Sequence, residues 1–161
     1  DALPISLPKV GSPMSVSSSV FTCITNNPDL TDCLSACTVV NGTAVDVMIR
    51  ARDLIHAGWI LIANPLYGNF KPNQQPYRTL VLSKKNDNKI DLESMKLLDD
   101  AMAVYRSAPI LRRPCELPEN IDKDFRYLDF VLMQETFRQT GILAAELCRT
   151  VVMPQPATKT C

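Results

Sequence analysis

Tyrosine, asparagine and basic side chains gather in one stretch of the sequence, residues 64–79, which reads NPLYGNFKPNQQPYRT. Two short apolar runs enclose this stretch, its three prolines restrict the backbone, and its Asn and Gly residues suit turns. Connections of this length are uncommon in compact domains, and those that occur are usually functional. The stretch therefore predicts where the protein binds something.

These side chains could donate several hydrogen bonds and two positive charges to a carboxylate, a phosphate or a protein backbone. A second polar turn follows the first apolar run and could bind an anion at a helix N-terminus, although helix capping explains it equally well. The candidate binding residues of both segments are Asn26, Asn27, Asn64, Tyr67, Gly68, Lys71, Asn73, Tyr77 and Arg78. The alternative is a structural loop whose Asn and Gly residues only complete turns.

Short apolar runs that alternate with amphipathic patterns predict an α/β domain with a small, mainly parallel sheet of three to four strands flanked by helices. The predicted strands are residues 20–25, 38–40, 59–63 and 79–83, and the predicted helices are residues 29–37, 43–57, 91–105 and a long C-terminal helix from about 122 that Gly141 kinks or divides. In such sheets the ligand crevice lies beyond the carboxyl ends of the strands. The two polar segments could therefore face each other if their strands are adjacent and parallel.

The domain boundaries follow from composition. Residues 20–150 suit a single α/β domain, residues 151–161 suit a disordered tail, and residues 1–19 suit a disordered leader that lacks the pattern of a signal peptide. Met14 stands shortly before the first strand pattern, so we expect the native chain to start there and residues 1–13 not to be native.

Charge and hydropathy bear on the class of partner. The 17 basic residues balance 17 acidic ones, and no run approaches the ~20 apolar residues that span a bilayer, so we expect neither a nucleic-acid nor a membrane partner. Within residues 64–89, five basic residues against one acidic residue leave a local excess of four positive charges. This excess predicts a basic neighbourhood with an anion preference, or merely solvated lysines at a strand end.

Catalytic and metal-binding patterns are weak. The sequence has no glycine-rich phosphate motif, and its six cysteines with one histidine favour mostly reduced thiols over a metal site or a bound cofactor. His56 suits a helix C-terminus better than a general base, and a Cys23–His56 nucleophile pair has no local signature. Asp129, in its apolar context, is either a strained acid or the partner of an arginine, and we expect the structural pairing. Whether the protein is an enzyme stays open.

Residues 24–28, 45–83 and 90–101 resemble the GrdX family, and the resemblance extends over roughly residues 21–131. Its distinctive parts are the N-N-P turn and the pattern P-L-x-G-x-x-K-P-N-x-x-P-Y of residues 65–77. Proteins of that family are named for their association with the glycine reductase system of anaerobic bacteria that ferment amino acids. The resemblance therefore implies a cytoplasmic bacterial protein linked to that system, and it carries over no catalytic residue.

Two functions compete at this point. The first is an accessory or interaction protein of the glycine, sarcosine or betaine reductase system, with glycine reductase components as partners and residues 64–79 as the contact. The second is a binding domain or an uncharacterised enzyme that holds a small anionic ligand, a carboxylate or a phosphate, with Lys71, Arg78 and the Asn26-Asn27 turn. A closed pocket would favour the ligand, and a protruding loop would favour the protein partner.

Overall fold

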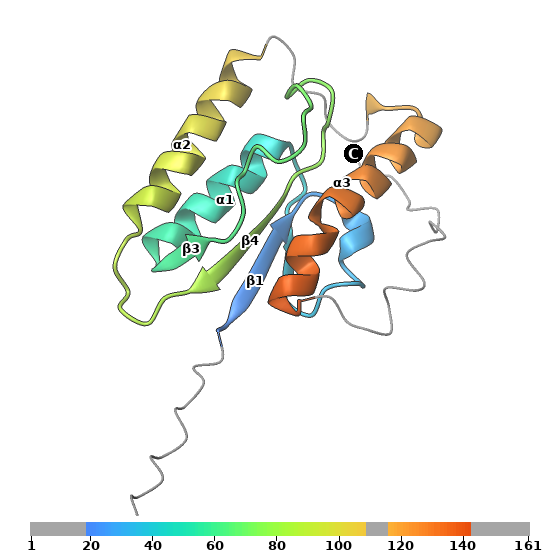
Figure 1. Ribbon diagram of the computed structural model, residues 1–161. Coiled ribbons are helices and arrows are strands. Elements are labelled where there is room, and N and C mark those ends of the chain that lie inside the picture. The colour runs from blue at the N-terminus through green and yellow to red at the C-terminus, as the bar shows by residue number, and fades with distance from the viewer. Residues whose placement is uncertain (1–18, 109–115, 143–161) are drawn as a thin grey trace, which may run out of the picture.

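Four strands form a sheet between two layers of helices in the computed structural model, which describes residues 19–108 and 116–142 (Figure 1). The elements in chain order are β1 (Phe21–Thr25), the 3-10 helix η1 (Pro28–Leu30), β2 (Cys37–Val39), α1 (Ala44–His56), β3 (Trp59–Leu61), β4 (Thr79–Lys84), α2 (Leu92–Ser107) and α3 (Glu119–Thr140). The predicted leader up to residue 18 and the predicted tail at residues 151–161 lie outside the described residues. That residues 20–150 form a single domain stays a prediction.

The sheet has the strand order β2-β1-β4-β3, and β4 runs antiparallel to both of its neighbours. Only β1 and β2 pair in parallel, so the predicted mainly parallel sheet is wrong, although the α/β class and the long C-terminal helix are confirmed. A parallel pair needs a crossover connection, usually a helix. Residues 62–78 between β3 and β4 contain no helix, and the chain therefore turns back to run beside β3 in the opposite direction.

The predicted helix at residues 29–37 is also wrong, because the helical part ends after the single turn of η1. Cys37 belongs to β2 and pairs with Cys23 of β1, so the backbone is extended where the helix was expected. Strand pairing overrides the local helix preference here. Cys33 and Cys37 consequently do not share a helix face. Cys23 and Cys37 are free thiols.

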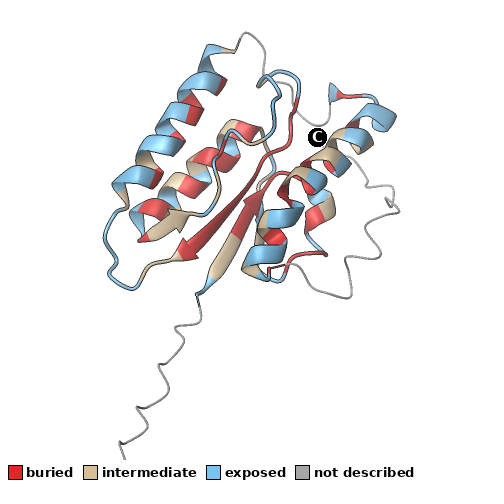
Figure 2. Cartoon of the chain, in the orientation of Figure 1, coloured by how far each residue is buried: buried red, intermediate tan, exposed pale blue. Residues whose placement is uncertain are grey.

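The core has two parts because side chains of each strand alternate between the faces of the sheet. On one face, Leu80 and Leu82 of β4 pack against α1 and α2, and on the other face Val81 packs against α3. β4 is almost entirely buried, whereas each helix turns an exposed side outward (Figure 2). The sheet thus fixes α3 on the opposite side from α1 and α2, as Figure 1 shows.

Local capping explains why α1 and α2 begin where they do. The Asp46 carboxylate accepts the backbone N–H of Thr43 at 2.7 Å at the start of α1, as the sequence predicted. The Asp91 carboxylate accepts the N–H of Ser94 at 2.9 Å at the start of α2. Such caps satisfy backbone donors that have no partner within the helix. Within the described residues, the search for a helix long and apolar enough to cross a membrane finds none.

Two glycines follow helix ends in the left-handed region of the backbone. Gly58 follows α1 at φ 88°, and Gly141 follows α3 at φ 69°. Gly141 therefore ends α3 at Thr140. Whether it divides a longer helix, as predicted, depends on residues beyond 142, which lie outside the described residues. The space around the two glycines differs. An added Cβ at Gly58 would lie 2.9 Å from the backbone Cα of Asn88, whereas at Gly141 it would meet no atom of the described residues within 4 Å.

This contrast predicts different costs for the same substitution. Gly141→Ala should lower the free energy of unfolding by about 1 kcal/mol, through backbone strain alone. Gly58→Ala should cost roughly 2–4 kcal/mol, because the backbone of residue 88 must also shift. Urea unfolding followed by circular dichroism measures both values. Equal losses in the two variants would contradict the close packing at Gly58.

Candidate functional site

The turn after β1 and the loop of residues 62–78 meet at one edge of the sheet. The antiparallel pairing of β1 with β4 sets Thr25 opposite Thr79, so the residues after β1 lie beside those before β4. Asn26 and Asn27 are buried at this edge. The two polar segments do converge, but the strand beside β1 is β4 and it runs antiparallel, contrary to the parallel arrangement that the sequence suggested.

Asn26 joins the two segments directly. Its side-chain N–H groups donate to the carbonyls of Pro76 and Gly42, at 2.8 and 3.1 Å. Its side-chain oxygen accepts the backbone N–H of Arg78 at 2.8 Å. The side-chain amide of Asn26 thus pairs with three backbone groups that would otherwise have no hydrogen-bond partner. The side chain of Asn26 is used internally and holds the end of the loop in place.

A fully buried carboxylate, Asp129 of α3, forms the centre of the site. Tyr67 donates its hydroxyl to one carboxylate oxygen at 2.6 Å, and Thr79 and Asn27 donate to the other at 2.7 and 3.2 Å. The Tyr67 hydroxyl oxygen also accepts the backbone N–H of Thr79 at 2.6 Å. A single side chain of α3 therefore connects the loop, β4 and the turn after β1.

Burial governs the protonation of this cluster. Desolvation raises the pKa of Asp129 above its usual value, although hydrogen bonds from Tyr67, Thr79 and Asn27 oppose the shift. Desolvation, with the nearby carboxylate, also raises the pKa of Tyr67 well above its usual value. The tyrosine hydroxyl therefore keeps its proton and acts as a fixed donor. The pair serves as an anchor for the loop.

A second buried cluster holds the end of the loop against α3. Tyr77 donates its hydroxyl to Asp122, and burial together with this carboxylate raises the pKa of Tyr77. Arg126, 3% exposed, forms ion pairs with Asp29 at 2.6 Å and with Asp122 at 3.3 Å. Ion pairs in a buried setting depend on keeping every partner, because an unpaired charge there is costly. The 3-10 helix η1, the loop and α3 are thus coupled.

Arg78 is also buried, and its guanidinium lies between two aromatic rings. Its central carbon is 4.3 Å from the ring centroid of Tyr67 and 5.5 Å from that of Tyr105. One terminal nitrogen donates to the carbonyls of Pro65 and Tyr67, at 3.2 and 2.9 Å. A desolvated cation–π contact contributes about 2 kcal/mol. Arg78 therefore binds the start of the loop from its position just before β4.

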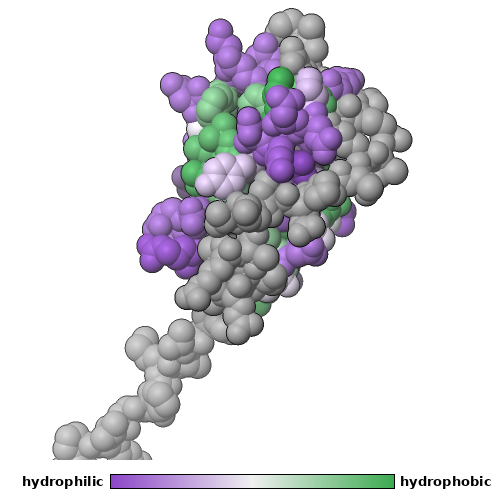
Figure 3. Space-filling model, turned by 90° about the vertical axis from the view of Figure 1, so that its right-hand side faces the viewer, coloured by the Kyte–Doolittle hydropathy of each residue, from purple (hydrophilic) through white to green (hydrophobic). Residues whose placement is uncertain are grey.

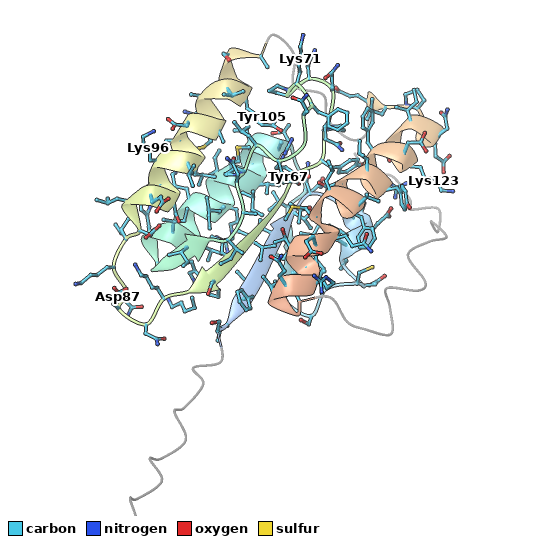
Figure 4. The ribbon with its side chains drawn as sticks, in the orientation of Figure 1. Tyr67, Lys71, Asp87, Lys96, Tyr105 and Lys123 are labelled. Carbon is cyan, nitrogen blue, oxygen red and sulfur yellow. The ribbon has the colours of Figure 1, made fainter. Side chains whose placement is uncertain are left out.

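The other predicted residues lie on the outside of the loop. Asn64, Lys71 and Asn73 are exposed, and the Asn64 side chain accepts the N–H of Leu66 at 2.9 Å to complete a turn. In Figure 4 Lys71 lies at the outer end of the loop, whereas Tyr67 lies beneath it. The nine predicted residues thus divide into a buried set and an exposed set. That any of them binds a ligand or partner stays a prediction.

Gly68 allows the loop to approach α3 closely. It has φ 73°, and an added Cβ would lie 2.9 Å from a methyl carbon of Leu132 and 3.3 Å from the ring of Phe70. A larger residue would therefore disturb both the backbone turn and the contact with the helix. Among the predicted residues of the loop, Gly68 has a steric role.

The predicted basic neighbourhood of residues 64–89 is not one surface. Arg78 is buried, and Lys84 lies at the far end of β4. Lys71 and Asp87 stand at opposite ends of the molecule in Figure 4. Charges that are close in the sequence are separated by the length of a strand, so they do not act together on one small anion.

Sequence reasoning missed much of the buried set. Asp122, Arg126 and Asp129 are spaced four and three residues apart, which places them on one face of a helix, and all three are buried. This polar stripe within an otherwise apolar helix face was the available signal. The predicted pairing of Asp129 with an arginine is wrong, because its direct partners are a tyrosine, a threonine and an asparagine.

The described residues supply little for acid–base or metal chemistry. They contain no group of three or more His, Cys, Asp or Glu side chains that could hold a metal ion, and His56 is exposed at the end of α1. The acceptors of Asp129 are occupied by hydrogen bonds within the cluster. In this part of the chain, the arrangement positions a loop and leaves its outer side chains open to contact.

The family model described as GrdX-like protein matches residues 22–138 of this chain. The match includes every residue of both buried clusters and the whole loop, and it confirms the resemblance inferred from the sequence. A search of curated proteins and a search of solved structures each find no match.

Removing one oxygen atom from the hydrogen-bonded cluster around Asp129 should have a large effect on the free energy of unfolding. Tyr67→Phe removes a donor to the buried carboxylate and leaves the N–H of Thr79 unpaired, so unfolding should become easier by roughly 2–4 kcal/mol. With one donor fewer, the folded-state pKa of Asp129 rises further above its unfolded value. The loss should therefore be largest near pH 7, where Asp129 is ionised, and should shrink toward about pH 4.

Urea unfolding across this pH range measures the effect. Tyr127→Phe is the matched control, because Tyr127 is 52% exposed on α3 and its change should stay within about 0.5 kcal/mol. A loss for Tyr67→Phe as small as that of the control would contradict the anchoring role.

Proposed function

We propose that this chain, which belongs to the GrdX-like protein family, is an accessory protein that binds a component of the glycine, sarcosine or betaine reductase system through the exposed side of residues 64–79. The link to that system is what the family resemblance implies. The contact surface is argued from the structure. The proposal assigns no catalytic step to the chain.

The observation that carries the proposal is the division of the loop into a buried root and an exposed tip. At the root, Tyr67 and Tyr77 bond to α3, Tyr67 also bonds to Thr79 of β4, and Arg78 bonds to the backbone of Tyr67, all through buried or part-buried hydrogen bonds. The tip, residues 69–71, is exposed. A loop whose conformation is already fixed loses little entropy on binding, and this favours a specific contact with another protein.

The chemistry of the tip also suits a protein partner. Leu66 and Phe70 are 38% and 40% exposed, and Lys71 adds a positive charge beside them. An exposed aromatic ring on a rigid support is the kind of residue that carries binding energy at protein interfaces. Viewed from the side of α3, hydrophobic residues gather beside hydrophilic ones on the surface (Figure 3). A mixed surface of this kind is typical of interfaces that form and dissociate.

Affinity purification of tagged protein from an anaerobic lysate of a glycine-fermenting bacterium tests the proposal. The wild-type protein should retain glycine, sarcosine or betaine reductase components, quantified by mass spectrometry. A variant with Phe70→Ala and Lys71→Ala should retain at least roughly tenfold less of the reductase components. The loss of an aromatic anchor weakens the binding free energy by more than about 1.4 kcal/mol.

The matched control combines Leu92→Ala with Lys96→Ala, which removes the same kinds of groups from the exposed side of α2. It should retain the reductase components at the wild-type level. If the wild-type protein retains none of them, the association is rejected. If the loop variant retains as much as the control, the association stands and the assigned contact surface is wrong.

A further inference from the structure

Two buried polar atoms, one just before β4 and one on α2, lack hydrogen-bond partners within the part of the chain that the structure describes. Arg78 is 2% exposed and its Nε has no partner, and Tyr105 is 1% exposed and its hydroxyl has none. Leaving a buried donor unpaired costs about 1–3 kcal/mol, and native proteins contain few such groups. Here two of them occur on side chains that contact each other, which points to a shared partner.

The geometry brings both groups to one place. The Arg78 guanidinium lies 5.5 Å from the ring centroid of Tyr105, and Figure 4 shows Tyr67 and Tyr105 close together beneath the loop. The hydroxyl of Tyr67 is already bonded to Asp129 and to the backbone of Thr79. Tyr67 therefore offers only its ring. The Arg78 guanidinium also interacts with the Tyr105 hydroxyl, and the donors that remain without an acceptor are the Arg78 Nε–H and the Tyr105 O–H.

The charge of Arg78 indicates which kind of partner fits. Among the described residues no carboxylate forms an ion pair with it, and its side-chain hydrogen bonds go to the neutral carbonyls of Pro65 and Tyr67. Asp129 is close enough for the charge of Arg78 to lower its pKa, but its oxygens accept hydrogen bonds from Tyr67, Thr79 and Asn27 instead. A buried guanidinium without an ion-pair partner favours the binding of a monoanion that accepts hydrogen bonds.

We propose that Arg78 and Tyr105 form a binding site for a small monocarboxylate, whose oxygens accept the Arg78 Nε–H and the Tyr105 hydroxyl. The site goes beyond the proposed protein contact and does not depend on it. It also differs from the anion site expected from the sequence, because Asn26 and Asn27 are used internally and Lys71 lies outside the loop.

Two points favour a carboxylate over a phosphate. A phosphate dianion would bring a second negative charge near Asp129 without a second cation to balance it, since Lys71 is on the exposed tip. Burial raises the pKa of Tyr105, so its hydroxyl keeps its proton and can donate to an ionised carboxylate. Since both donors lie in the core, the smallest carboxylates, formate and acetate, are the probes of choice.

Thermal unfolding in sodium acetate or sodium formate, compared with sodium chloride at the same ionic strength, tests the site. Carboxylate should raise the melting temperature of the wild-type protein and of the control variant Tyr127→Phe. In Tyr105→Phe the carboxylate affinity should fall roughly tenfold or more, because one of two charge-assisted hydrogen bonds is lost.

Tyr105→Phe also separates a ligand site from a structural role. Without carboxylate it should melt at the wild-type temperature or above, because it removes an unpaired buried hydroxyl and keeps the ring. Acetate should in addition shift the Arg78 Nε–H resonance of wild-type protein in nuclear magnetic resonance, a readout that needs no variant.

Three outcomes would overturn the proposal. The first is no stabilisation by acetate or formate beyond that of chloride, together with an unchanged Arg78 Nε–H resonance. The second is equal stabilisation of wild type and Tyr105→Phe. The third is stabilisation by inorganic phosphate alone that is lost in Tyr105→Phe, which would assign the same residues to a different anion.

Discussion

The structure around the loop depends on the burial of the Asp129 carboxylate among three donors. A carboxylate in the core is unfavourable by itself, and its raised pKa shows that desolvation outweighs the hydrogen bonds it receives. The donors compensate for part of that cost only when all are in place. The loop, β4 and the turn after β1 must therefore adopt one arrangement together.

This constraint explains why a segment of 17 residues without a helix, residues 62–78, can be ordered. Its prolines limit the backbone, but limited freedom does not select one conformation. Selection comes from contacts at its two ends, where Tyr67 bonds to α3 and Arg78 bonds back to the start of the loop. Buried polar groups thus give the loop specificity, while the two apolar cores supply most of the stability.

The sequence predicted the local features of the fold well. The capping residues of α1 and α2, the stop at Gly58 and the four strands follow from short-range patterns, and the structure has them near the expected positions. The direction of β4 was missed because it depends on what the preceding connection does in space. The expected helix at residues 29–37 stops after η1, and its last residue pairs with β1 instead, a tertiary contact that short-range patterns do not reveal.

The candidate site was predictable in part. The composition of residues 64–79 identified the right segment, and the Asn26-Asn27 turn was correctly expected to lie near it. Which side chains turn inward could not be read from residue type, because Tyr77 and Arg78 are as polar as the exposed Lys71 and Asn73. Their burial depends on distant partners. The Tyr77 hydroxyl bonds to Asp122 of α3, 45 residues further along the chain, and Arg78 contacts the rings of Tyr67 and of Tyr105 of α2.

The partners of Asp129 lie far apart in the sequence, and its bond to Asn27 spans 102 residues. During synthesis from the N-terminus, β1, the loop and β4 all leave the ribosome before the residue that anchors them. The loop can therefore reach its final conformation only after α3 has been made and has docked on the sheet. A nascent or truncated chain that lacks α3 would carry the loop sequence without its fixed shape, so any contact that depends on that shape is confined to the finished fold.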